Sequence, residues 1–276
     1  MAVLLALASA VTIGTSDMLG TIAGRRGGVL AAVLANFLLG GLLLVPVAVV
    51  FGGSPTIGDL ALGAVAGVLG GVGLLSLYAG YATTTVGIVA PLAAVLGAVV
   101  PVTVGLAIDV VPGAVGVAGI AVGLIAIALI AVAPTDAAAR EPRRAVGFGL
   151  LAGFALGIMV TLLGITDSDA GLWPLVPARA TSALTLLPIA AYRQTHLMAG
   201  GGAWRLLPFV GVLSAGGMAL FVLAAQQNLV VAGVLLNMAY AVTAILAIIF
   251  FGERSTYLQR YGFALAAVSI TMLAIG

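Results

Sequence analysis

The chain has 276 residues, of which 63% are hydrophobic and only 7% are charged, with a formal net charge of +2. Soluble domains average about a quarter charged residues, so this composition excludes an ordinary soluble domain. The mean hydropathy of +1.33 and the 39 glycines favour a helical membrane protein, because glycine is more frequent in transmembrane helices than in soluble ones.

Several kinds of functional site are also excluded. The chain has no cysteine and a single histidine, His196, so we expect no disulfide, no cysteine nucleophile and no metal site. All ten cations are arginines spread along an apolar chain, which does not make the basic surface that binds nucleic acid. No GxxxxGK[ST] loop indicates an ATP-driven pump. We therefore expect no cofactor and no nucleic-acid partner, and the use of arginine without lysine is typical of a GC-rich bacterial genome.

Ten apolar stretches follow one another along the chain, each near the roughly 20 residues that a membrane-spanning helix needs. We predict spans at residues 2–23, 29–51, 60–82, 87–108, 114–133, 146–166, 173–192, 206–226, 230–251 and 257–276. No positive charge precedes the first stretch, so we expect it to be a retained helix and not a cleaved signal peptide.

The charges predict how these spans are oriented, because alternate connectors share one side of the membrane. One side receives Arg25, Arg26, Arg140, Arg143, Arg144, Arg193, Arg205, Arg254 and Arg260. The other side receives no arginine and only Asp59, Asp109, Asp167 and Asp169. Arginine-rich connectors face the cytoplasm in most membrane proteins, so both termini are expected outside.

The sequence also contains an internal repeat. A shift of 143 residues places Gly14 on Gly157, Gly119 on Gly262 and Asn36 on Arg179. We predict two five-helix units at residues 1–133 and 146–276, joined by a connecting loop at 134–145. Five is an odd number, so the second unit is inverted. The expected fold is an all-α membrane protein with ten transmembrane helices as two inverted five-helix repeats, an architecture of secondary transporters whose substrate site lies near the midplane.

Short motifs resemble those of EamA-domain transporters of the drug/metabolite transporter superfamily. Residues 251–262 (FGERSTYLQRYG) resemble the family's GER signature before the last helix. Residues 14–20 (GTSDMLG), residues 86–92 (VGIVAPL) and Arg179 resemble its first, fourth and seventh helices. The first half departs from the pattern, since residues 109–111 read DVV where GER would stand. The family is usually drawn with cytoplasmic termini, opposite to the orientation that the arginines predict.

Four polar residues are predicted inside the membrane, where ionisable and polar side chains usually face a cavity or a partner. Asp17 and Asn36 are expected in one layer, about 9 Å from the arginine side at 1.5 Å per residue. Arg179 and Asn237 are expected in a second layer, as deep from the opposite side. The roughly 10–12 Å between the layers argues against a direct ion pair between Asp17 and Arg179.

Each of these residues has two interpretations. Asp17 either binds a proton or cation during transport or is structural, as the cap of a kinked helix near Gly14 and Gly20 or as a side chain that snorkels into a wet vestibule. Arg179 either contacts an anionic substrate or is structural, bonded to carbonyls or to a loop acid. Asn36 and Asn237 either bind substrate or tie helices together.

Aromatic residues and prolines complete the set of candidates. Tyr78, Tyr81 and Tyr240 are packing or interface aromatics, or they belong to the site, with Tyr240 nearest the midplane. Pro91 and Pro101 are predicted to break the fourth helix, either to expose backbone carbonyls to the pathway or to serve packing alone.

These features predict a secondary active transporter, an exporter of small organic metabolites or drugs across the bacterial cytoplasmic membrane, working by alternating access. Its expected partners are a small-molecule substrate, lipid and protons, the protons coupled through Asp17, and the protein itself is a monomer or homodimer. A passive channel or a non-transporting scaffold is the alternative. An enzyme is not expected, because Asp17 has no second membrane carboxylate at helical spacing and no Ser/His pair is present.

Overall fold

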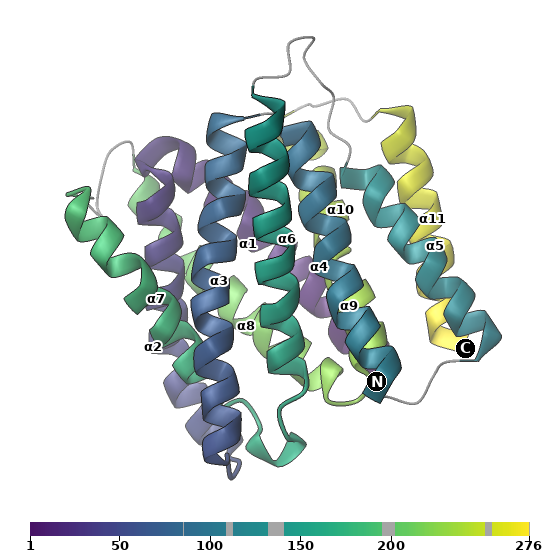
Figure 1. Ribbon diagram of the computed structural model, residues 1–276, viewed down its shortest axis with the longest axis horizontal. Helices are drawn as coiled ribbons and strands as arrows, with labels where there is room; N and C mark the ends of the chain where they lie inside the picture. Colours follow the sequence, from purple (N-terminus) through teal and green to yellow (C-terminus); the bar gives the residue numbers. More distant parts are fainter. Residues whose placement is uncertain (85, 109–112, 132–140, 195–201, 252–255, 276) are drawn as a thin grey trace.

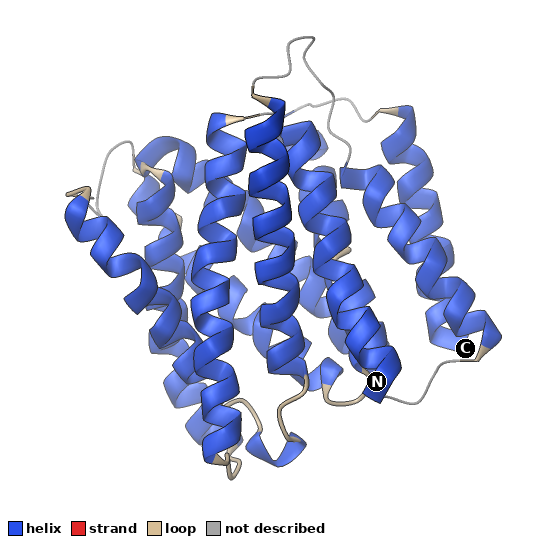
Figure 2. Cartoon of the chain, in the orientation of Figure 1, coloured by secondary structure: helices blue, strands red, loops and turns tan. Residues whose placement is uncertain are grey.

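The computed structural model describes residues 1–84, 86–108, 113–131, 141–194, 202–251 and 256–275, and within these ranges it contains helices and no strand. The helices are α1 (Ala2–Gly27), α2 (Val29–Phe51), α3 (Ile57–Thr83), α4 (Val86–Ile108), α5 (Ala114–Ala131), α6 (Pro142–Gly164), α7 (Leu175–Tyr192), α8 (Leu207–Ala225), α9 (Leu229–Leu236), α10 (Ala239–Phe251) and α11 (Tyr257–Ile275). Two short 3-10 turns, η1 (Ser168–Ala170) and η2 (Ala203–Arg205), precede α7 and α8. Figures 1 and 2 show the helices side by side in one bundle.

The prediction of ten apolar helices is confirmed within the described ranges, where ten helical spans are long and apolar enough to cross a membrane. The second span has the predicted bounds, while α1 runs on to Gly27. The predicted connecting loop 134–145 is wrong at its end, because α6 already begins at Pro142, a residue well suited to the first turn of a helix. Residues 132–140 lie outside the described residues.

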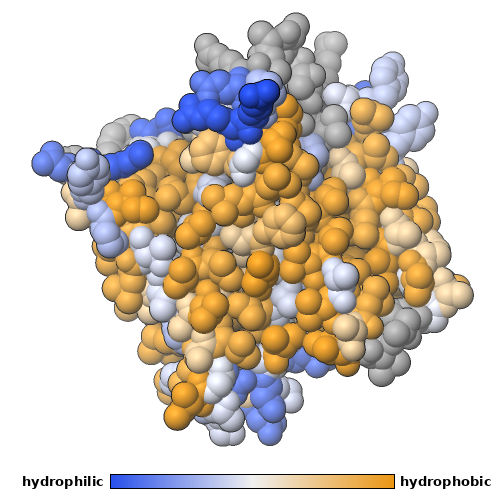
Figure 3. Space-filling model, viewed as in Figure 1, coloured by the Kyte–Doolittle hydropathy of each residue, from blue (hydrophilic) through white to orange (hydrophobic). Residues whose placement is uncertain are grey.

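The surface separates into an apolar belt and two polar ends (Figure 3). Large apolar side chains such as Leu42, Val50 and Ile249 are mostly exposed, as expected for residues that contact lipid. Consecutive helices alternate in direction, so the arginines beside α1, α6, α7, α8 and α11 share one end of the bundle. We call this the arginine end (Arg25, Arg26, Arg143, Arg144, Arg193, Arg205 and Arg260).

The opposite end of the bundle holds both chain termini (Figure 1) and is called the acidic end (Asp59, Asp167 and Asp169). Three residues of the predicted charge pattern, Arg140, Arg254 and Asp109, lie outside the described residues, as do residues 252–255 of the motif at 251–262.

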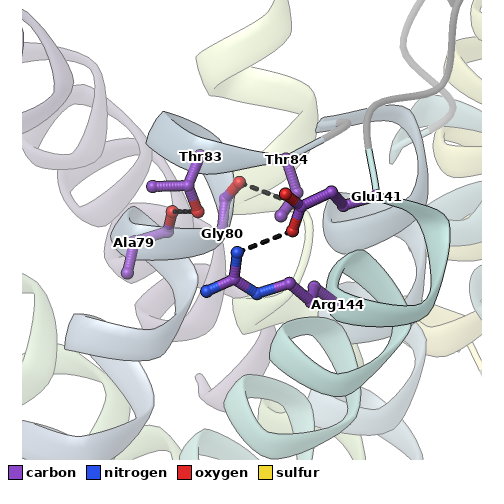
Figure 4. A network of polar contacts seen from close by, with 6 residues as sticks. All are labelled: Ala79, Gly80, Thr83, Thr84, Glu141 and Arg144. Carbon is purple, nitrogen blue, oxygen red and sulfur yellow. Dashed lines mark hydrogen bonds and ion pairs between the residues drawn. The ribbon is translucent and has the colours of Figure 1, made fainter.

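At the arginine end, α3 finishes beside the start of α6 (Figure 4). The hydroxyl of Thr83 donates to the Ala79 carbonyl at 2.7 Å, and the hydroxyl of Thr84 donates to the Gly80 carbonyl at 2.8 Å, which satisfies carbonyls of the last turn. Arg144 pairs with Glu141 at 2.6 Å, with both side chains more than half exposed. An exposed pair of this kind contributes little to stability.

At the acidic end, hydrogen bonds tie the α2–α3 connector to the α6–α7 connector. Thr56 and Asp59 form a reciprocal capping box at the start of α3. The second oxygen of Asp59 accepts from the backbone N–H of Asp167 at 3.0 Å, and the N–H of Ser54 donates to the Asp169 carbonyl at 2.8 Å. These bonds join the two halves of the chain where their helices leave the apolar belt.

The helices pack in pairs that mix the two halves. α1 packs on α8 and α10, α3 packs on α6 and α7, α4 packs on α6 and α9, and α2 packs on α7 and α8. α5 and α11 pack mainly on each other. Glycines allow the close approach, and a Cβ built on Gly67 of α3 would overlap the Ala178 carbonyl and the Thr181 hydroxyl of α7.

The interruption of a span occurs in the ninth helix and not in the fourth. α4 is continuous through Pro91 and Pro101, so the breaks predicted there are wrong. The ninth span is divided at Asn237 and Met238 into α9 and α10. The Nδ2 of Asn237 donates to the Gly233 carbonyl at 2.9 Å, and the N–H of Met238 bonds three residues back to Leu235. An asparagine side chain that bonds its own backbone competes with the regular helical ladder.

Candidate functional site

A cavity of about 130 Å³ lies among the helices of the bundle. Eight of the ten spans contribute lining residues, and none comes from α5 or α11. Most of the lining is apolar, which is usual for small-molecule sites with a few polar groups that fix orientation. The polar side chains of the lining are Asp17, Asn36, Arg179, Ser182, Ser214, Asn237 and Tyr240.

Arg179 projects from the start of α7 and is 5% exposed. Its Nη1 donates to Oδ1 of Asn36 at 3.2 Å, and its Nη2 donates to Oγ of Ser214 at 3.0 Å. Its guanidinium carbon lies 5.5 Å from the ring centroid of Phe37, a cation–π distance. A Cβ built on Gly41 would lie 3.2 Å from Cβ of Arg179, so the small residues of α2 provide the space for this arginine.

The charge of Arg179 is not balanced by a carboxylate in the part of the chain that the structure describes, where Arg144–Glu141 is the only ion pair. The alternative that Arg179 binds a loop acid is therefore wrong for Asp167 and Asp169, since neither forms an ion pair with it. Two of the five N–H groups of the guanidinium have partners among the described residues.

Asp17 borders the same cavity from α1 and is half-buried. The hydroxyl of Tyr78 donates to its Oδ1 at 3.4 Å, which is long for such a bond. A Cβ built on Gly20 would lie 2.9 Å from that hydroxyl, so Gly20 makes room for Tyr78. α1 is continuous from Ala2 to Gly27, and the alternative that Asp17 caps a helix end is therefore wrong.

Three tyrosines interact with this carboxylate. Tyr78 is 6% exposed and bonds Asp17, but it does not line the cavity. Tyr81 and Tyr240 lie near enough to Asp17 to interact with its charge. Tyr240 is the one tyrosine of the three in the cavity lining.

Asn237 lies at the break between α9 and α10 and is 8% exposed. Its Nδ2 is bonded to Gly233, while its Oδ1 has no partner within the described ranges. A Cβ built on Gly97 of α4 would lie 3.0 Å from this oxygen. Irregular backbone at membrane depth is tolerated where it is buried in protein or lines a cavity, and here it lines one.

The two polar layers predicted from the sequence are wrong as separate layers. Asn36 and Arg179 were expected on opposite sides of the midplane, yet they are hydrogen-bonded to each other. The position of a residue along its helix gives the depth of its backbone, whereas the long side chain of Arg179 carries its charge away from the backbone toward α2. Asp17 and Arg179 form no ion pair with each other, in agreement with expectation.

Sequence reasoning missed Ser214, Phe37 and Gly97. Ser214 is one of many small polar residues in apolar helices, and nothing in the sequence distinguishes it from the others. Phe37 directly follows Asn36, and the signal that could have found it is the preference of arginine for aromatic faces.

Comparison with known proteins adds the fold. No protein-family model matches the sequence, and no curated protein matches it. A crystal structure of another protein superposes on 99% of this chain and 96% of its own, with a TM-score of 0.77 at 14% sequence identity. This likeness extends over the whole chain and concerns the fold alone. The described residues thus form an all-helical bundle of a known fold with ten apolar spans, eight of which line a mostly apolar cavity that contains a few polar side chains.

Proposed function

We propose that the protein is a secondary active transporter that exports small organic solutes by alternating access, with protons coupled through Asp17. The observation that carries this proposal is the cavity inside the apolar bundle, which has a carboxylate and a guanidinium on its wall. Charged groups inside a membrane are costly and mark ion or substrate pathways. Both halves of the chain build the cavity, as an alternating-access site requires.

Packing contacts support the proposal that the halves are inverted repeats. A Cβ on Gly14 would lie 2.6 Å from the Ala239 carbonyl, and a Cβ on Gly157 would lie 3.0 Å from the Leu96 carbonyl. Gly14 and Gly157 are 143 residues apart, and so are Leu96 and Ala239. The same contact therefore occurs twice, with the two halves exchanged.

A second pair of contacts follows the same rule. A Cβ on Gly119 would lie 3.3 Å from Leu273, and a Cβ on Gly262 would lie 2.8 Å from Ile130. Gly262 and Leu273 are Gly119 and Ile130 shifted by 143 residues. Two sets of exchanged contacts, far apart in the bundle, are expected for units related by a twofold axis and not for chance similarity of apolar sequences.

The cavity lies where such an axis would pass. Five pairs of lining residues differ by 143 in number: Ile13 and Leu156, Asp17 and Val160, Asn36 and Arg179, Ala93 and Leu236, and Gly97 and Tyr240. Equivalent positions of the two halves thus line the cavity, but their side chains differ. Asp17 has an apolar counterpart, so we assign proton coupling to the first half and anion contact to the second.

Three further assignments belong to this proposal. The motifs in residues 14–20, 86–92 and 251–262 suggest an EamA-type transporter of the drug/metabolite transporter superfamily. The arginine end is placed in the cytoplasm, with both termini outside. The membrane is assigned as the bacterial plasma membrane.

The test is transport by purified protein in liposomes that enclose a pH-sensitive dye. A panel of metabolites and drugs is added under an imposed pH gradient, and a transported solute is recognised by the proton flux that it induces. We expect Asp17→Asn to abolish this proton flux and Arg144→Gln, an exposed change at the arginine end, to leave it unchanged. Unaltered pH-driven flux in Asp17→Asn would falsify the coupling assignment.

A passive channel is distinguished by counterflow. Liposomes loaded with unlabelled solute should transiently accumulate labelled solute above equilibrium if the protein alternates between two states. A pore gives no such overshoot, and a non-transporting scaffold gives no flux for any solute.

A further inference from the structure

We infer that Arg179 binds a carboxylate of the transported solute, so that the substrate class is small organic carboxylates. That the bound solute is transported rests on the proposed function, whereas the binding site itself follows from the geometry around Arg179. Three observations carry it: an unbalanced buried charge, a guanidinium held in place, and a cavity of limited size.

The first observation is a buried cation without an anion. Arg179 is 5% exposed, and the described residues offer it two neutral oxygen acceptors and one aromatic ring. Burying a charge without a counter-charge is expensive. A ligand anion that enters the cavity would remove this cost, and three N–H groups of the guanidinium remain to receive it.

The second observation is that the guanidinium is held in position before any ligand arrives. Asn36, Ser214 and the ring of Phe37 each fix one part of it. Gly40 and Gly41 pack against the same side chain, since a Cβ on Gly40 would lie 3.4 Å from Nη1. A rigid planar fork of N–H donors matches the two oxygens of a carboxylate. Asn36 and Ser214 act as positioning residues in this arrangement.

The third observation sets the size and charge of the ligand. A volume of about 130 Å³ is near that of an engineered cavity, about 150 Å³, that holds one benzene molecule. Asp17 lies on the wall of the same cavity, and its charge disfavours a dianion such as phosphate. A cavity lined by one arginine and one acid therefore favours a small ligand with one carboxylate.

Two kinds of ligand carry a single carboxylate, and the charge of Asp17 distinguishes between them. A simple monocarboxylate suits the cavity when Asp17 carries a proton, because the site then has one positive charge. A solute with both an ammonium and a carboxylate suits it when Asp17 is ionised, because each charge then meets its opposite. Neutralising Asp17 should weaken only the second kind of ligand.

The experiment measures ligand binding to the purified full-length protein in detergent by isothermal titration calorimetry. The probes are propionate and benzoate, the neutral amides propionamide and benzamide, the zwitterion alanine, and chloride and phosphate as inorganic anions. We expect at least one carboxylate to bind about tenfold or more tightly than its amide. Equal binding of acids and amides, or of chloride and the best carboxylate, would overturn the inference.

The variants assign the site. Arg179→Gln should weaken the best carboxylate by about 10- to 100-fold, the range for a hydrogen-bonded charge, and leave the amide unchanged. Arg144→Gln is the matched control and should bind as the parent does. Arg179→Lys keeps the positive charge but lacks the planar pair of guanidinium donors, so it should retain part of the affinity. This variant tests the assignment if Arg179→Gln does not fold. Full affinity in a folded Arg179→Gln protein would refute the assignment.

This measurement separates the inference from the proposed function. Carboxylate binding without any flux in liposomes would contradict transport and keep the site. Flux of non-carboxylate solutes that is insensitive to Arg179→Gln would support transport and contradict the site. In the Asp17→Asn protein, loss of alanine binding identifies a zwitterionic substrate, and retained propionate or benzoate binding identifies a monocarboxylate.

Discussion

Asn36 and Arg179 are 143 residues apart and are joined by a hydrogen bond of 3.2 Å. In the inverted-repeat arrangement that we propose, with an offset of 143 residues, each of these side chains meets its own counterpart. In such an arrangement only positions close to the twofold axis can do so, because elsewhere the axis carries equivalent residues apart. The contact joins an amide in one half of the chain to a cation in the other.

Replacing Asn36 by aspartate would put a carboxylate beside this guanidinium. We expect Asn36→Asp to lower the affinity for small carboxylates by about tenfold or more, because a built-in anion occupies the charge that the ligand needs. Asn36→Ala removes one interhelical bond, worth about 1 kcal/mol or less, and should have a smaller effect. Dissociation constants from calorimetry compare the two, and an Asn36→Asp protein that binds as tightly as the parent would count against Arg179 as the ligand site.

Tyr78 tests how much of the behaviour of Asp17 depends on its one hydrogen-bonded neighbour. The hydroxyl-to-carboxylate distance of 3.4 Å is long, so this bond contributes little. We expect Tyr78→Phe to keep pH-gradient-driven flux and to move the pH midpoint of transport by less than about half a unit. A larger shift, with the protein still folded, would show that the tyrosine takes part in proton transfer.

The approach of α3 to α7 gives a prediction about stability. A side chain at Gly67 has no space, because its Cβ would overlap Ala178 and Thr181. We expect Gly67→Ala to destabilise the protein by about 1–3 kcal/mol, the usual cost of overpacking.

Gly147 is the matched control for this change. It lies in a helix with nothing within 4 Å of its Cβ position, so Gly147→Ala should be neutral or stabilising by up to about 1 kcal/mol. Thermal unfolding in detergent measures both variants, and equal midpoints for the two would contradict the packing described here.

The sequence predicted the helices well and their breaks poorly. The second span was placed correctly because its apolar run ends at Gly28 and Gly52, which adopt φ of 99° and 77° and close the helix at either side. Hydropathy does not register the break at Asn237, since that break arises from a side chain bonding its own backbone. Prolines in the fourth span suggested a break that the packed bundle does not have.

For the site, Asp17, Asn36, Arg179, Asn237 and Tyr240 were all predicted, and all line the cavity. Their contacts were not predictable in the same way. Depth along a helix gives the position of a backbone atom, and it says nothing of where a long side chain ends. The partners of Arg179 come from helices that only the folded chain brings together.

The break in the ninth span predicts opposite effects for its two asparagines. Asn237→Leu removes the bond to Gly233 and extends a run of leucines, so we expect equal or higher thermal stability and at least tenfold slower transport. Asn228 caps the start of α9 by accepting from the Val231 N–H at 2.8 Å. Asn228→Ala should cost about 1 kcal/mol of stability and leave transport per folded molecule unchanged. The break has no role in transport if Asn237→Leu moves solute at the parental rate.

Membrane orientation can be measured directly because the chain has no cysteine. Ser168→Cys at the acidic end and Arg143→Cys at the arginine end both occupy exposed positions. We expect a membrane-impermeant maleimide to label Ser168→Cys in intact cells and Arg143→Cys only after permeabilisation. The reverse pattern would place both termini in the cytoplasm.

The pairing of α5 with α11 has a consequence for how such a molecule would move. These helices contribute nothing to the cavity wall, and the contacts of Gly119 with Leu273 and of Gly262 with Ile130 are equivalent under the repeat that we propose. In the proposed alternating-access cycle, a transition that exchanges the conformations of the two halves leaves this contact unchanged. We therefore expect the helices that line the cavity to rearrange while α5 and α11 stay together, and a crosslink placed between these two helices should not slow transport.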